Sequence, residues 1–206
     1  MLKIWGRKNS NNVRKVLWCA EEIGLPYERI DAGGVFGRVN EPGYLAMNPN
    51  GRVPVIEDGD LVLWESNAIV RYLAARYSPG ELSPELPAER ALADRWMDWT
   101  TSTLVPTFTP VFLGLIRTPP SERDNAAIKR GIEQCSEVLA IADAALAERP
   151  YLSGDTLGIG DIPLGALAYA WFEMPIVRPD LLNLRRWYDA LRERDAYRLA
   201  VMTELT

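Results

Sequence analysis

Four small polar residues, Asn9, Ser10, Asn11 and Asn12, stand in a row between a segment typical of a β-strand and a segment typical of a helix. The first turn of a helix carries partial positive charge and N–H groups without partners, so a hydroxyl or amide there can help to hold an anion. The same residue types are also ordinary helix caps. The local sequence therefore leaves two interpretations open, an anion site or simple capping.

The composition narrows the available chemistry. The chain has 206 residues, no histidine and a formal net charge of −5. The lack of imidazole excludes a Ser-His-Asp triad, a Cys-His pair and a histidine-ligated metal, and the negative charge argues against a nucleic-acid partner. Cys19 and Cys135 form no CxxC motif, so neither a disulfide framework nor a zinc site is predicted. No apolar run approaches the roughly 20 residues of a membrane span and the N-terminus lacks a secretory signal, so we expect a cytoplasmic protein.

The first part of the chain alternates between strand and helix patterns. Apolar residues at helical spacing predict a helix that ends at Gly24, and Ser66 can cap another. Asp58-Gly59-Asp60 is typical of a hairpin turn. The expected strands are 2–5, 26–31, 53–58 and 61–66, and the expected helices are 13–24, 42–51 (a short helix or turn) and 66–77. This order predicts a four-stranded mixed sheet with helices packed on it.

The second part of the chain has only helical patterns. A segment rich in proline and glycine, 79–87, reads as a linker between domains at 1–78 and 88–206. A long helix is expected after Pro87, with Pro106 and Pro110 kinking or ending it. Further helices are expected at 121–150, 162–174 and 181–201, which predicts an all-α domain.

Three other segments, together with the polar quartet, resemble the cytosolic glutathione transferase family. They are NPNGRVPVIED at 48–58, LWESNAIVRYLA at 63–74 and GDTLGIGDIPLGALAY at 154–169. The opening WGRKNSNNVRKV is similar to the serine-type bacterial and theta-like classes. The resemblance implies a thioredoxin-like α/β N-terminal domain and a helical-bundle C-terminal domain. It also implies glutathione as co-substrate, no metal, a small electrophile as second substrate and a homodimer.

The resemblance also assigns roles to the polar quartet and the proline motif. Ser10 is the first choice for the group that donates to the glutathione thiolate, Asn12 the second and Asn11 the third. The Val53-Pro54 bond is expected to be cis, which is inexpensive only before proline, and the Val53 backbone to pair with the cysteinyl backbone of glutathione. The local alternative is an ordinary proline before an edge strand.

The remaining roles concern the two ends of glutathione and the second substrate. Ser66, at a helix start, suits the γ-glutamyl carboxylate and Glu65 suits its ammonium, although any helix can have a capping serine beside an acid. Arg52 is expected to meet the glycyl carboxylate. Asp161 is expected to be structural, in a helix that begins near Gly158. The wall of the electrophile site, between the two domains, is expected from aromatic and hydroxyl residues that could equally be core: Trp99, Thr103, Phe108, Phe112 and Tyr169.

The resemblance favours one activity and leaves two alternatives. The favoured activity is conjugation, in which the glutathione thiolate attacks a small electrophile without a covalent enzyme intermediate. The alternatives are glutathione-dependent disulfide or peroxide reduction on the same fold, and a transferase-like interaction module without catalysis. A cysteine near Ser10, which a glutaredoxin-type mechanism would need, is absent, and an interaction module tends to lose the motif residues that this chain keeps.

Overall fold

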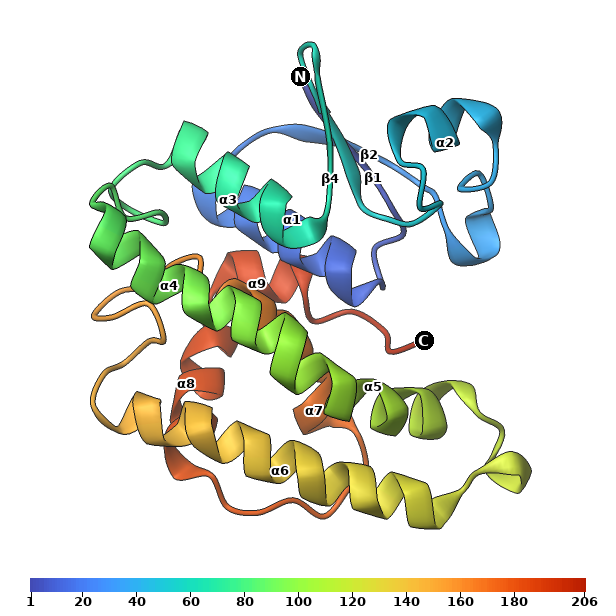
Figure 1. Cartoon of the computed structure of the whole chain (residues 1–206), viewed down its shortest axis with the longest axis vertical. Helices are drawn as coiled ribbons and strands as arrows, with labels where there is room; N and C mark the ends of the chain where they lie inside the picture. The colour runs from blue at the N-terminus through green and yellow to red at the C-terminus, as the bar shows by residue number, and fades with distance from the viewer. The chain divides into compact units, whose positions relative to one another are not determined.

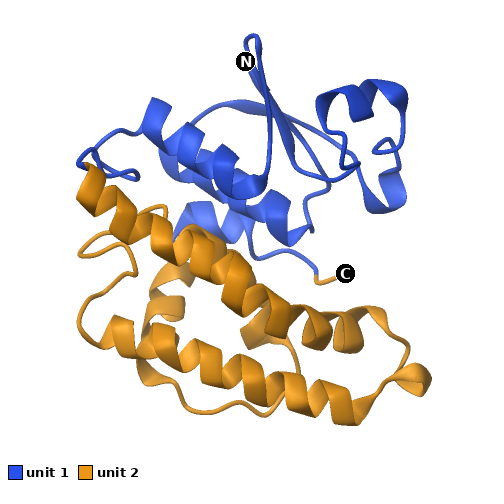
Figure 2. Cartoon of the chain, in the orientation of Figure 1, with its two compact units in different colours: residues 1–86, 194–204 blue, residues 87–193, 205–206 orange.

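The computed structural model describes residues 1–206 and divides into two compact units. Unit 1 comprises Met1–Leu86 and Arg194–Glu204, and unit 2 comprises Pro87–Glu193 and Leu205–Thr206 (Figure 2). Unit 1 contains the whole sheet, and unit 2 has no strand.

Unit 1 is built on a mixed four-stranded sheet (Figure 1). Its strands are β1 (Leu2–Trp5), β2 (Tyr27–Ile30), β3 (Val55–Asp58) and β4 (Leu61–Trp64), in the order β2-β1-β3-β4. β1 pairs parallel with β2 and antiparallel with β3, and β3 pairs antiparallel with β4. Parallel pairing needs a helical crossover, whereas the tight turn after Asp58 makes the hairpin. The predicted sheet is confirmed.

Helices complete unit 1. They are α1 (Asn11–Ile23), α2 (Pro42–Met47), α3 (Ser66–Tyr77) and α9 (Asp195–Ala200), with a 3-10 turn at Gly34–Phe36. α1 ends at Gly24, whose φ of 69° is the left-handed conformation of a helix C-cap. α1 contacts α3 and α9, so a continuous run of its residues, 13–20, is buried.

The segment 194–204 packs with unit 1, although the sequence predicts one helical domain over 88–206. Trp18 of α1 and Tyr197 of α9 make an edge-to-face contact with ring centroids 4.8 Å apart. Arg14 is fully buried and donates to Thr203 Oγ1, Thr203 O and Glu204 O at 2.7 to 3.0 Å. A buried guanidinium needs acceptors, and these backbone carbonyls and the hydroxyl supply them.

Unit 2 is helical throughout. Its α-helices are α4 (Pro87–Trp99), α5 (Val105–Phe112), α6 (Asn125–Ala147), α7 (Ile162–Glu173) and α8 (Leu182–Arg192), with a 3-10 turn at Pro120–Glu122. α7 is buried on nearly all sides, as expected for its apolar sequence. The prolines do not interrupt the chain's helical path. Pro106 lies near the start of α5 and Pro110 lies inside it, and π-helical turns, η2 (Thr100–Leu104) and η3 (Leu113–Arg117), flank α5.

Asp161 is fully buried and organises the entry to α7. Its carboxylate accepts hydrogen bonds from the N–H groups of Leu152, Ser153 and Gly158 and from Trp187 Nε1, at 2.8 to 3.2 Å. α7 begins at Ile162 with Asp161 at the N-cap, so the expectation of a helix start near Gly158 is wrong by about one turn. Residues 158–161 form a turn instead, because the Asp161 carboxylate accepts a hydrogen bond from the Gly158 N–H.

Replacing Asp161 with alanine is expected to lower the free energy of unfolding by about 3 to 5 kcal/mol, because buried donors lose their charged acceptor. Urea unfolding measures this loss. Asp155→Ala, at an exposed position close by, is the matched control and should change stability little. An Asp161→Ala protein as stable as wild type would contradict the structural role.

Candidate functional site

Three loops meet at one edge of the sheet. The register pairs Trp5 with Val55 and Val55 with Trp64. The end of β1, the start of β3 and the end of β4 therefore lie side by side. The quartet follows β1, Val53-Pro54 precedes β3 and Glu65-Ser66 follows β4, so the topology gathers the motifs of unit 1.

Ser10 is the N-cap residue of α1, but its side chain does not cap the helix. Its backbone is extended, and its carbonyl accepts from the N–H of Arg14 at 2.9 Å. Its half-buried hydroxyl makes no hydrogen bond within the chain. The loop between β1 and α1 contains Gly6. A Cβ there would stand 2.4 Å from Val13 Cγ2, so a larger residue would clash with α1. The hydroxyl is thus left for a partner outside the chain, which weighs against simple capping.

The two amides beside Ser10 have partners within unit 1. Asn11 Oδ1 accepts from Arg14 Nη1 at 3.0 Å, and Asn12 Oδ1 accepts from Ser66 Oγ at 3.3 Å. Asn11 therefore belongs to the anchor of the C-terminal segment, and Asn12 links α1 to α3. These bonds use only the amide oxygens, so the Nδ2 groups of Asn11 and Asn12 remain possible donors beside the Ser10 hydroxyl, which makes no hydrogen bond at all.

The loop before β3 is held from one side only. The Val53-Pro54 bond is cis, as the resemblance implies. The carbonyl of Arg52 accepts from Tyr44 Oη at 2.8 Å and from Asn48 Nδ2 at 2.7 Å. The N–H and C=O of Val53 take no part in the hydrogen bonds of the chain's loops, so they can pair with an extended peptide. The Arg52 side chain is exposed and makes no ion pair.

Glu65 has a strained backbone. Its φ of 73° and ψ of 109° are unusual for a residue with a side chain, and such conformations typically cost about 1 to 3 kcal/mol and cluster at functional sites. Its carboxylate is exposed. No sequence signal marked this position as strained, because glutamate seldom adopts positive φ.

The burial of Lys15 could not be read from the sequence. A lysine beside the polar quartet could add positive potential but is more often only solvated, yet this side chain is only 3% exposed. Its Nζ lies 3.4 Å from Ser66 Oγ and 3.3 Å from Asn67 Oδ1. Burial lowers the pKa of Lys15 to about 8, against the opposing attraction of Glu65. A positive charge therefore lies directly behind the start of α3.

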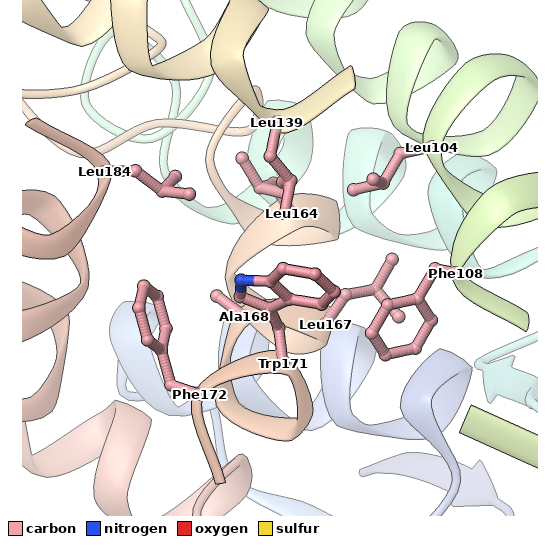
Figure 3. A pocket seen from close by; sticks show the side chains of 9 residues that line it. All are labelled: Leu104, Phe108, Leu139, Leu164, Leu167, Ala168, Trp171, Phe172 and Leu184. Carbon is pink, nitrogen blue, oxygen red and sulfur yellow. The ribbon is translucent and has the colours of Figure 1, made fainter. Parts of the chain in front are cut away.

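The site residues expected from unit 2 do not form one open pocket within it. Phe108 and Phe112 are buried and stacked, with centroids 5.8 Å apart, whereas Trp99 and Thr103 are half-buried. Phe108 lines an apolar cavity of about 10 Å³. In Figure 3 the rings of Phe108 and Phe172 stand on opposite sides of Trp171. A cavity of this size holds about one water molecule and an apolar one stays empty, so the ring of Phe108 serves unit 2 as a packing group.

The structure contains neither a helix that could span a membrane nor a cluster of acidic or thiol side chains that could bind a metal ion. No helix is both long and apolar enough to cross a membrane. No group of three or more cysteine, aspartate or glutamate side chains is placed to hold a metal ion.

Comparison with known proteins gives the family. The model of the glutathione S-transferase N-terminal domain matches residues 1–75, and that of the C-terminal domain matches residues 92–195. The chain belongs to the glutathione S-transferase family. The resemblance seen in the motifs is confirmed, as is the fold class.

Several relatives of this transferase are known by sequence and structure. Glutathione S-transferase GstB of Escherichia coli is 48% identical over 204 residues, covering 98% of each chain. Glutathione S-transferase 4 of Zea mays is 30% identical over 199 residues, covering 95% of this chain and 89% of the relative. The theta-class glutathione S-transferase from Xanthomonas axonopodis pv. citri, solved with glutathione bound, is 60% identical and superposes with a TM-score of 0.96 over 100% of this chain and 99% of that chain.

Proposed function

We propose that this protein is a glutathione transferase that binds glutathione in unit 1 and conjugates its sulfur to a small electrophile. The observation that carries the proposal is the unengaged Ser10 hydroxyl at the N-terminus of α1, at the sheet edge where the other motifs gather. The names of the Escherichia coli and Zea mays relatives, and the glutathione bound to the Xanthomonas protein, support it.

The geometry suggests how glutathione is held. Its cysteinyl backbone pairs with the open N–H and C=O of Val53, whose orientation Pro54 sets. Ser66, at the start of α3, binds its γ-glutamyl carboxylate, and Glu65 binds its ammonium. Arg52, whose side chain is exposed beside Val53, binds the glycyl carboxylate. Each assignment matches a charged or polar group of the tripeptide to a complementary group of unit 1, of which Ser66 is held only by long hydrogen bonds to Lys15 and Asn12.

Ser10 stabilises the glutathione thiolate, which carries out the chemical step. A free thiol has a pKa of about 8.5, so only a few per cent is thiolate at neutral pH. The hydroxyl donates to sulfur and the α1 dipole favours negative charge, with Asn12 and Asn11 as the second and third choices for the donor. The thiolate then attacks the electrophile: a sulfur–carbon bond forms, and either a leaving group departs with its electron pair or an added proton completes an addition.

The second substrate is the less defined partner. We propose that Trp99 and Thr103 contact the electrophile and that Phe108 supports them from within unit 2. Phe108→Ala is then expected to cost about 3 to 5 kcal/mol of stability and to raise the KM of the electrophile more than that of glutathione. Thermal unfolding and steady-state kinetics measure the two effects; a change in the glutathione KM alone would contradict this placement.

Binding and conjugation are tested in sequence. Titration with glutathione, followed by tryptophan fluorescence or calorimetry, should show saturable binding. A panel of aryl halides, halogenated acids, epoxides and peroxides then defines the electrophile. An absence of binding at millimolar glutathione would contradict the proposal and favour an interaction module.

The cysteines bear on the reductase alternative. Cys19 and Cys135 are both buried and unpaired. Burial raises the pKa of each thiol, that of Cys135 to about 12, so neither is a reactive thiolate. Any reduction of a disulfide or peroxide would have to be done by bound glutathione itself, which the peroxide arm of the panel detects.

Location and assembly follow from the family as expectations. We propose a cytoplasmic protein, in keeping with two free thiols and no disulfide. We also propose a homodimer. Val62, Trp64 and Leu92 are exposed apolar side chains, which a second copy could cover. Light scattering with size-exclusion chromatography should give twice the chain mass of 23.1 kDa.

A further inference from the structure

Lys15 carries a buried positive charge that the chain itself does not neutralise well. An ammonium has three donors, and here two of them reach neutral oxygens, Ser66 Oγ at 3.4 Å and Asn67 Oδ1 at 3.3 Å. Both distances exceed the usual range of about 2.7 to 3.2 Å. The charged neighbour, Glu65, is exposed. Lysine is seldom fully buried without a close ionic partner, so this charge is poorly compensated in the free protein.

Lys15 also determines what the Ser66 hydroxyl can do. Because an ammonium only donates, it occupies a lone pair of Ser66 Oγ and leaves the hydroxyl hydrogen to point elsewhere. In the free chain that hydrogen goes to Asn12 Oδ1 at 3.3 Å, again a long contact. A carboxylate at the start of α3 is a better acceptor than this amide, and it brings the negative charge that Lys15 lacks.

We propose that Lys15 is a positioning residue that acts through Ser66 to select thiol substrates with a free α-carboxylate at their γ-glutamyl end. This inference rests on the proposed function and deepens it. The ammonium holds Ser66 as a donor toward the ligand and supplies the countercharge from behind. The buried charge is thus retained for recognition, at the expense of the stability of the free protein.

Lys15→Met separates recognition from a structural role, because methionine keeps much of the length and removes the charge. The free variant is expected to melt above the wild type, since an uncompensated buried charge is lost. Its affinity for glutathione is expected to fall about tenfold, or about 1.4 kcal/mol. The loss should fall on the KM of glutathione far more than on kcat. Lys129→Met, an exposed lysine of α6, is the charge-matched control and should change none of these quantities.

A ligand analogue gives the decisive comparison. Calorimetry with γ-aminobutyryl-cysteinyl-glycine, which lacks the α-carboxylate, should show about tenfold or greater weakening for the wild type. For Lys15→Met, and for Lys15→Gln as a second variant, glutathione and the analogue should bind almost equally, because the two deletions remove the same interaction.

The outcomes that contradict the proposal are distinct. If Lys15→Met keeps the full preference for glutathione over the analogue, Lys15 does not read the carboxylate. If the variant is less stable or fails to fold, Lys15 is a structural residue. If the wild type binds no glutathione at all, the proposed function is wrong, and that result is separable from the other two.

Discussion

Ser10→Ala is expected to raise the pKa of the thiol of bound glutathione by about two units, which corresponds to about 2.7 kcal/mol of lost thiolate stabilisation. A hydrogen bond to a charged group is worth about 1.5 to 3 kcal/mol, which covers this loss, while the α1 dipole is unchanged in the variant. If the wild-type pKa is near 6.5, the thiolate fraction at that pH falls from about one half to about one hundredth. Turnover at pH 6.5 should then fall about 50-fold, and by much less near pH 9.

The pH dependence makes this prediction specific. Ultraviolet absorption of the thiolate measures the pKa, and steady-state kinetics across the same pH range measures turnover. Glutathione affinity should stay within a few-fold, because the contacts at Val53, Glu65 and Ser66 remain. Ser121→Ala, which removes an exposed hydroxyl from unit 2, is the control. An unchanged pKa in Ser10→Ala would move the donor role to Asn12.

Glu65 should show opposite effects on stability and on binding. Glu65→Gln keeps the side-chain shape and removes the charge that pairs with the glutathione ammonium. We expect affinity to fall about 30-fold, or about 2 kcal/mol, typical of a hydrogen bond between charged groups. Glu65→Gly should bind as weakly, yet its free energy of unfolding should rise by about 1 kcal/mol, because glycine adopts a φ of 73° with less strain than glutamate.

Arg38→Gly is the matched control for the backbone effect. Arg38 is the other non-glycine residue with positive φ, at 67°, and its replacement should raise stability by a similar amount. Calorimetry for binding and urea unfolding for stability give both readouts. A Glu65→Gly protein that is less stable than wild type, or that binds glutathione normally, would contradict the view that strain at Glu65 serves ligand binding.

Local signals predicted much of unit 1. Alternating strand and helix patterns, the hairpin at Asp58-Gly59-Asp60 and the cap at Gly24 each report on neighbouring residues, so each could be read from a short window. The strand order β2-β1-β3-β4 was not predicted, and this order is what brings the three loops to one edge of the sheet. The cis bond came from the motif rather than from physics, since a local reading of Val53-Pro54 also allowed a trans proline.

Features that depend on distant partners were not predictable. Arg14 and Lys15 stand next to each other on α1 and look like solvated charges in sequence. Their burial follows from α9 and α3 covering α1, and Arg14 bonds to residues almost the whole chain away. The start of α7 was misplaced for the same reason, because Trp187 and Leu152 decide where the Asp161 carboxylate sits.

The central claim is that Ser10 holds the glutathione thiolate at the start of α1. A crystal structure of this protein with glutathione tests it most directly, through the distance between the glutathione sulfur and Ser10 Oγ. We predict a distance of about 3 to 3.5 Å, with the γ-glutamyl carboxylate at Ser66. Sulfur bound instead to Asn12 or Asn11, or lying away from the α1 N-terminus, would contradict the account.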